Sequence, residues 1–270
     1  MGWLRSRSPF IVLSGILGMG MVIFLLLPIA SSILGSAAGI PGALEDASTV
    51  NAIATSFYCA FLATLFTLAL GVPLAYVFAR RSFPGKSLLD PLIDLPILIP
   101  HNAAGIALLM ILSPASPVGG LFQSIGVGFV DTAWGIVAAM AFVSAPFMIR
   151  SAQDAFVAVD PAMEHVAKSL GANELQAFRH ITLPLAARGV LTGCLLAWAR
   201  SISEFGAVVI LAYYPITAPI HLFDTFVTEG LARALPINGL LIIIAVVVLL
   251  VFSRLLVRQG RMLKPRGVGK

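Results

Sequence analysis

The chain has 270 residues, of which 59% are hydrophobic and only 11% are charged, and its mean hydropathy is +1.00. Soluble globular domains carry about 25% charged residues, so this composition excludes a soluble protein and predicts an all-α integral membrane protein. In such a chain the net charge of +5 reports orientation in the membrane, and we expect no nucleic-acid partner.

Six segments are long and apolar enough to cross a bilayer as helices, which takes about 20 residues each. In chain order they are 10–34, 51–79, 92–112, 132–149, 185–211 and 237–257. The first is longer than the apolar core of a signal peptide and has no clear small-residue cleavage site, so we expect it to be retained as a helix.

Lysine and arginine gather on one side of these six spans. Arg233 lies in an opposite loop and Arg200 lies inside a span. Basic residues collect in cytoplasmic loops, so the pattern predicts a multi-pass plasma-membrane protein with both termini in the cytoplasm. The basic tail, 255–270, can also contact anionic lipid. The residues on the basic side are Arg5, Arg7, Arg80, Arg81, Lys86, Arg150, Lys168, Arg179, Arg188, Arg254, Arg258, Arg261, Lys264, Arg266 and Lys270.

The third predicted span carries two prolines and a histidine. Pro96 and Pro100 leave backbone carbonyls free and allow a bend, which suits a helix that gates a pathway. His101 is expected mid-span, either as a packing residue or as a pathway group.

A polar insert, 157–183, separates the fourth and fifth spans. Asp160 followed by Pro161 is typical of a helix start, and Gly171 suits the left-handed position beyond the helix end. Between them an apolar stripe recurs at i, i+3, i+4 and i+7. The stripe is narrow and lacks large aromatic anchors, which favours docking into a protein groove over lying on the bilayer. It consists of Met163, Val166, Ala167 and Leu170.

A second short helix is predicted after Gly171. Asn173 and Gln176 have the spacing of a capping box. Pro184 should end or kink this helix where the chain returns to the membrane.

The fifth predicted span contains two opposite charges. Arg200 and Glu204 are four residues apart, so on a helix they can face each other. They form either a self-neutralising pair that fixes packing or a pair in which Glu204 holds Arg200 beside an anion pathway. Ser201 and Ser203 offer hydroxyls to an oxyanion or to the helix backbone. Gly206 permits close helix approach at the same depth.

The insert resembles the conserved loop of ABC importer permeases, written E-A-A, three residues, G, nine residues, I-x-L-P. Ala167, Gly171, Ile181, Leu183 and Pro184 match it, whereas His165 and Val166 stand where the pattern has Glu and its first Ala, and Glu164 lies one place earlier. Three further stretches are similar to molybdate- and tungstate-type permeases: F-P-G-K at 83–86, D-L-P through I-P-H at 94–101, and A-R-S-I-S-E-F-G-A at 199–207.

The resemblance implies a type I ABC importer permease fold and a division of labour. The chain would form the pathway for a tetrahedral oxyanion, with a second copy of itself, two cytoplasmic ABC ATPase subunits and an extracytoplasmic oxyanion-binding protein. ATP and magnesium would sit on the ATPase, so this chain is expected to be no enzyme and to hold no cofactor. The ATPase-coupling residues would be Met163, Glu164, His165, Val166, Ala167, Lys168, Leu170 and Gly171. The candidates for the pathway and gate are Pro96, Pro100, His101, Arg200, Ser201, Ser203, Glu204, Phe205 and Gly206.

Three alternatives stay open at this point. A sulfate or thiosulfate permease of the same superfamily would share these motifs. An ion-coupled secondary transporter would also carry charges inside the membrane, but it would not need the polar insert. A membrane enzyme would need a catalytic cluster, and the sequence has no HExxH, no GxSxG and no paired carboxylates facing one site.

Three parts are expected along the chain. Residues 1–50 form the first span and an outer loop, and residues 51–254 form the transporter core with the coupling loop 157–183. The basic cytoplasmic tail is 255–270. Cys59 and Cys194 lack metal-ligand spacing and are expected to be small buried residues, so no metal site is predicted.

Overall fold

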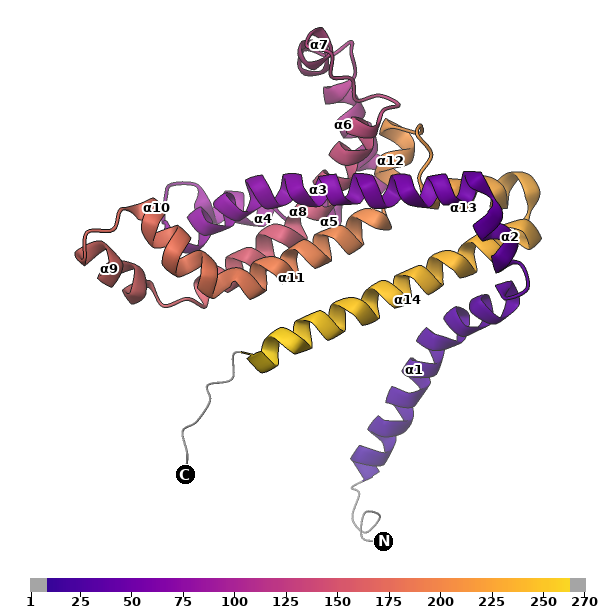
Figure 1. Ribbon diagram of the computed structural model, residues 1–270, viewed down its shortest axis with the longest axis horizontal. Coiled ribbons are helices and arrows are strands. Elements are labelled where there is room, and N and C mark those ends of the chain that lie inside the picture. The colour runs from indigo at the N-terminus through magenta and orange to yellow at the C-terminus, as the bar shows by residue number, and fades with distance from the viewer. Residues whose placement is uncertain (1–8, 263–270) are drawn as a thin grey trace. The chain divides into compact units, whose positions relative to one another are not determined.

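The computed structural model describes the backbone of residues 9–262 and the side chains of residues 9–252 and 254. Helices make up most of this part of the chain (Figure 1). The predicted basic side chains of Arg5, Arg7, Arg258, Arg261, Lys264, Arg266 and Lys270 lie outside the described residues. The helices are α1 (Pro9–Ser36), α2 (Ile40–Glu45), α3 (Ala47–Arg80), α4 (Lys86–Leu92), α5 (Leu95–Leu98), α6 (His101–Leu112), α7 (Pro117–Ser124), α8 (Ala133–Val157), α9 (Pro161–Ser169), α10 (Glu174–Ala177), the π-helical turn η1 (Phe178–Thr182), α11 (Leu183–Ile202), α12 (Gly206–Leu211), α13 (Ala218–Glu229) and α14 (Leu231–Met262).

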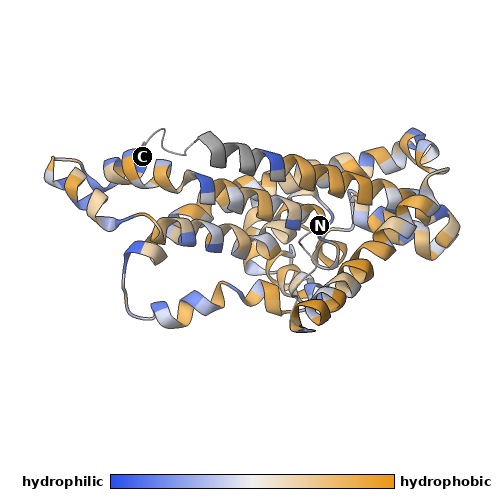
Figure 2. Cartoon of the chain, turned by 90° about the horizontal axis from the view of Figure 1, so that it is seen from below, coloured by the Kyte–Doolittle hydropathy of each residue, from blue (hydrophilic) through white to orange (hydrophobic). Residues whose placement is uncertain are grey.

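The protein is an all-helical membrane protein with five or six candidate spans among the described residues. Five helices are long and apolar enough to cross a membrane, and the segments Lys86–Leu98 and His101–Leu112 are so when they are taken together as one bent span. Figure 2 shows that the long helices are hydrophobic over most of their length. The five are Pro9–Ser36, Ala47–Arg80, Ala133–Val157, Glu174–Ile202 and Leu231–Phe252.

The third predicted span is not one helix. Its two parts meet at an angle of 112°, with Ile99 extended at φ −78° and ψ 145° and Pro100 as the N-cap of α6. A residue before proline is pushed out of the helical region, and proline has no N–H to continue the ladder. The bend that the prolines were expected to allow is therefore present, but it divides the span into separate helices, so His101 opens α6 instead of lying mid-span.

The fifth predicted span is also interrupted. α11 ends at Ile202, residues 203–205 are not helical, and α12 begins at Gly206. The sequence predicts Glu204 on the fifth helix, but Glu204 lies in the break between α11 and α12. The fourth span, by contrast, continues to Val157, so Arg150 lies inside α8 and not in a loop.

The chain divides into two compact units, one of residues 1–50 with 222–249 and one of residues 51–221 with 250–270. In the first, Asn238 donates a hydrogen bond to Ser32 across 2.7 Å. The second contains all of the residues that the sequence pointed to as functional.

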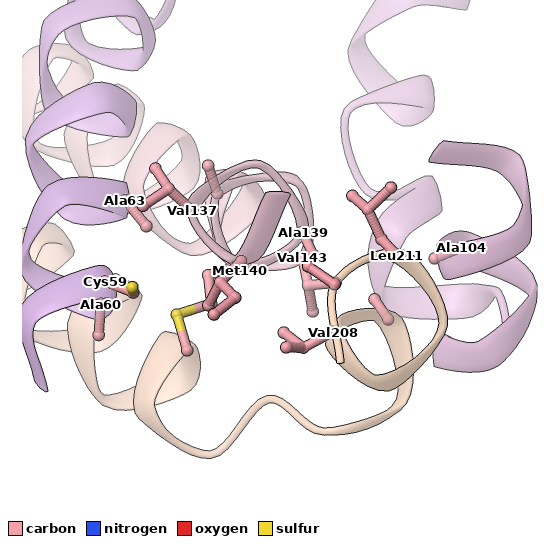
Figure 3. Packing of buried hydrophobic residues seen from close by; sticks show 14 of the residues in the cluster. Cys59, Ala60, Ala63, Ala104, Val137, Ala139, Met140, Val143, Val208 and Leu211 are labelled. Carbon is pink, nitrogen blue, oxygen red and sulfur yellow. The ribbon is translucent and has the colours of Figure 1, made fainter. Parts of the chain in front are cut away.

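The core of the second unit is built largely from small side chains (Figure 3). Cys59 and Ala60 of α3 and Ala104 of α6 are fully buried, together with Met140 of α8 and Val208 of α12. Small residues let helix backbones approach closely, which substitutes for the missing hydrophobic drive between helices in lipid. The prediction that Cys59 is a small buried residue is confirmed, whereas Cys194 is only half-buried.

Candidate functional site

The polar insert forms the short helices that the capping signals predicted. The Asp160 carboxylate accepts a hydrogen bond from the Ala162 N–H at 2.9 Å. Gly171 has φ +94°, and the Asn173–Gln176 capping box is present with both bonds at 2.9 Å. These local features are confirmed because each depends only on neighbours in the chain.

The second short helix does not end at Pro184. α10 runs through the π-helical turn η1 into α11, and Pro184 lies in the first turn of α11. A widened turn accommodates the missing proline N–H without stopping the helix. Of the two predicted effects of Pro184, an end of the helix is therefore not found, and Glu174–Ile202 is one candidate span with a π-helical turn just before the proline.

The apolar stripe of α9 faces away from the rest of the chain. Met163, Val166 and Leu170 are 50%, 61% and 84% exposed, and Ala167 is half-buried. Leu175 on α10 is also exposed. The insert therefore carries several large apolar side chains that the described part of the chain leaves uncovered.

The opposite face of α9 is held by one buried carboxylate. Glu164 is 5% exposed and accepts hydrogen bonds from Arg80 Nε at 2.7 Å, Thr182 Oγ1 at 2.8 Å and the Tyr76 hydroxyl at 3.0 Å. Arg80 Nη2 also donates to the carbonyl of Val159 at 2.8 Å. Glu164, one of the predicted ATPase-coupling residues, therefore has its side chain directed inward, away from the exposed stripe.

These bonds decide the ionisation of Glu164. Burial raises the pKa of its carboxyl, but the hydrogen bonds from Thr182, Arg80 and Tyr76 and the Arg80 charge outweigh burial and hold the pKa below its ordinary value. The carboxylate is therefore charged at neutral pH, and the buried ion pair with Arg80 is intact.

A second cluster joins the broken span to α8. The Arg150 guanidinium donates to both carboxylate oxygens of Asp94, at 2.9 and 2.7 Å, and to Asp90 Oδ1 at 2.7 Å. It also donates to the Asp90 carbonyl and to Gln153 Oε1. A planar guanidinium is suited to such two-pronged binding of carboxylates, so it fixes α4 and α5 against α8.

The two helix breaks meet at the charged pair of the fifth span. Arg200 Nη2 lies 2.7 Å from Glu204 Oε2 and 2.9 Å from His101 Nε2. Glu204 Oε1 accepts the Ala207 N–H at 2.9 Å near the start of α12. The predicted contact of Arg200 with Glu204 is thus confirmed, although Glu204 lies beyond the end of the helix.

The other candidate pathway residues differ in how far their side chains are buried. Ser201 is fully buried, and its hydroxyl has no hydrogen-bond partner within the described part of the chain. Ser203 is exposed and bonds back to the Arg200 carbonyl at 3.1 Å. A Cβ on Gly206 would lie 2.6 Å from Asn102 Oδ1, which confirms the predicted close approach. Pro96 is buried, and Phe205 is half-buried.

Sequence reasoning missed the partners that lie far away in the chain. Arg80 and Tyr76 were not connected with Glu164, and Arg150 was not connected with Asp90 or Asp94. Their separations of 84, 88, 60 and 56 residues carry no spacing signal. The available hint was the cost of charged groups near apolar segments, which requires a partner somewhere. Among the described residues no group of three His, Cys, Asp or Glu side chains could hold a metal ion.

Comparison with known proteins finds a transport family and several relatives described as transport permeases. Residues 71–266 match the family model "Binding-protein-dependent transport system inner membrane component". The chain is 42% identical over 81% of its length to a molybdate/tungstate transport system permease protein of Pyrococcus furiosus, covering 82% of that protein. A homologous permease of Thermococcus kodakarensis, described in the same words, is 38% identical over 94% of this chain and 99% of its own. A sulfate transport system permease protein of Synechocystis is 32% identical over 89% of this chain and 87% of its own.

Solved structures show the same fold at low sequence identity. A bacterial ABC transporter involved in import of the acidic polysaccharide alginate has a chain with a TM-score of 0.73 and 16% identity, covering 92% of this chain and 96% of that chain. An amino acid ABC transporter has a TM-score of 0.54 and 18% identity, over 80% of this chain and 94% of that one.

Proposed function

Since the chain belongs to the family of inner membrane components of binding-protein-dependent transport systems, we propose that it forms the membrane pathway for a tetrahedral oxyanion, molybdate or tungstate. As a member of this family it is the permease of an ABC importer and not the ATPase. The observation that supports this substrate is the identity of 36–42%, over 75–94% of this chain, to permeases described as molybdate/tungstate transport system permease proteins. The sulfate permeases reach 32–37% identity, so sulfate is the second candidate.

The proposed topology has six crossings and cytoplasmic termini. It counts the bent pair α4–α5 and α6 as one crossing and places the basic loops inside. Within it, residues 1–50 supply the first crossing and an outer loop, 51–254 the transport core, and 255–270 a basic tail.

The exposed stripe of α9 is the proposed docking surface for the ATPase. An amphipathic helix binds a groove through side chains at i, i+3 and i+7, and Met163, Val166 and Leu170 have that spacing and are exposed. We propose one ATPase per permease, two permease copies, and an external binding protein that delivers the anion. ATP and magnesium are bound by the ATPase in this scheme.

The pathway is proposed to pass the meeting point of the two helix breaks. Broken helices in membrane proteins are tolerated where they line a cavity or are covered by protein. Here the side chain of Arg200 is 21% exposed and its guanidinium lies beside His101 and Ser203, whereas Glu204 is buried and serves to hold Arg200.

Transport by the complete complex tests this function. In proteoliposomes holding the permease, its ATPase and its binding protein, we expect molybdate uptake that needs ATP and is competed by tungstate but not by a large excess of sulfate. Sulfate uptake without molybdate uptake would favour the second candidate. Uptake that needs only an ion gradient would contradict an ABC importer.

The topology predicts which positions are reached from outside. In sealed cells, an impermeant thiol reagent should label Glu45→Cys but not Lys168→Cys, because α9 lies inside. The parent chain is the control, since Cys59 is buried and Cys194 half-buried. Labelling of Lys168→Cys in intact cells would place the α9 loop outside and contradict the proposed topology.

A further inference from the structure

The face of α9 that carries the buried Glu164 attaches this helix to the rest of the chain, whereas the face that carries the exposed stripe does not. Both oxygens of Glu164 are used, Oε1 by Arg80 and Thr182 and Oε2 by Tyr76. The side chains of Arg80 and Glu164 are only 9% and 7% exposed. A buried charge pair with all its partners in place is rigid, because moving either group leaves a charge unpaired in a poorly hydrated place.

The bonds of this pair join four elements at one point. Tyr76 and Arg80 lie one turn apart on the last two turns of α3, and Thr182 ends η1 at the start of α11. Val159, which follows α8, is bonded to the same guanidinium. The ends of α3 and α8, the start of α11 and the whole of α9 are thereby tied together.

Aromatic packing around the ring of Tyr76 also stabilises this junction. The ring of Tyr76 contacts Phe156 of α8 and Phe178 of η1 edge-on, with centroids 5.6 and 4.7 Å apart. Phe156 is fully buried. The hydroxyl end of Tyr76 binds the carboxylate while its ring is held in the core, so α3 cannot rotate independently of Glu164.

The neighbouring ion pair between Arg81 and Glu174 is exposed and not buried. Arg81 binds Glu174, but the two side chains are 58% and 64% exposed. Exposed pairs contribute little because water and salt screen them. The chain thus offers two adjacent arginines at the end of one helix, one in a buried junction and one on the surface.

We propose that Glu164 and Arg80 are positioning residues that make α9 move as one body with the end of α3, so that a displacement of the docked ATPase reaches the membrane core. This inference rests on the proposed function, since it takes α9 as the docking helix. The route continues along α3 to Cys59 and Ala60, which pack against α8 in the core.

The test uses the complete complex with Arg80→Gln and Glu164→Gln. The exposed stripe is unchanged in both, so the ATPase should co-purify as with the parent. We expect the molybdate taken up per ATP hydrolysed to fall by about 5- to 150-fold, the range typical of a coupling between two sites. Arg81→Gln removes the same charge from the neighbouring exposed position and should keep the parental ratio.

The outcomes separate the inference from a purely structural role. If the junction only stabilised the fold, assembly, ATP hydrolysis and uptake would fall together, and uptake per ATP in the assembled fraction would stay parental, which would overturn the proposal. Parental uptake per ATP in fully assembled variants would overturn it as well.

A second readout on the permease alone keeps the inference distinct from the proposed function. Backbone amides of α9 should exchange with solvent faster in Glu164→Gln than in the parent or in Arg81→Gln, with exchange in α8 unchanged. A parent that binds no ATPase would refute the proposed function, whereas unchanged α9 exchange would refute the anchoring itself.

Discussion

Replacing Arg200 by glutamine should lower the free energy of unfolding by about 3–5 kcal/mol, the cost of leaving one member of a buried ion pair without its partner. Glu204 is 1% exposed, and Arg200 Nη2 is 2.7 Å from its carboxylate. Without the guanidinium, Glu204 retains the Ala207 N–H but no adjacent arginine charge. Thermal unfolding in detergent, calibrated by denaturant, measures the loss.

The pair is asymmetric, which makes the reverse change informative. Glu204→Gln should cost less than Arg200→Gln, because the Arg200 side chain is 21% exposed and also contacts His101. The double variant should be more stable than Arg200→Gln alone, because neutralising Glu204 removes the buried charge that the single change leaves unpaired. A double variant that costs the sum of the two single changes would show that the contact contributes nothing.

Transport separates the two roles of Arg200. If its charge attracts the anion, the double variant should regain stability but take up little molybdate at low substrate concentration. A double variant that transports like the parent would remove Arg200 from the pathway and leave it a packing role.

Replacing Arg150 by leucine should cost about 1.5–3 kcal/mol, the net value of a hydrogen bond to a charged group. The cost is below that expected for Arg200 because the side chains of Asp90 and Asp94 are 34% and 37% exposed and can be rehydrated. The loss should appear in thermal unfolding, and it should be largest where α4 and α5 lose their attachment to α8.

Arg150→Lys is the matched control for charge. It keeps the positive charge but cannot bind both oxygens of Asp94 and reach Asp90 as a planar fork does. We therefore expect lysine to recover only part of the lost stability. Full recovery would mean that charge alone, and not the geometry of the guanidinium, holds the broken span against α8.

The sequence predicted some of this site with residue-level accuracy. The N-cap at Asp160, the left-handed turn at Gly171 and the capping box of Asn173 with Gln176 are all present. Each involves residues within four positions of one another, so the backbone geometry of a short helix dictates the contact. The contact of Arg200 with Glu204 was predicted from their spacing of four residues, and it forms although Glu204 lies beyond the end of α11.

Hydropathy predicted the spans but not their interruptions. Both breaks are short, and the segments that flank Ile99 and Phe205 are apolar, so a hydropathy average over a whole span stays high across each break. Pro100 hinted at the first break, whereas the second has no proline. There Gly206 packs against Asn102 and His101, a contact between two segments about a hundred residues apart.

The sequence by itself determined that this is a helical membrane protein, where its local helix caps lie, and which transporter family it belongs to. Only the tertiary structure decided which way each side chain faces. The stripe of α9 is exposed while Glu164 is buried against Arg80, 84 residues away. A buried charge must find a partner, but which partner it finds depends on how helices distant in the chain pack, and spacing along the sequence carries no record of that packing.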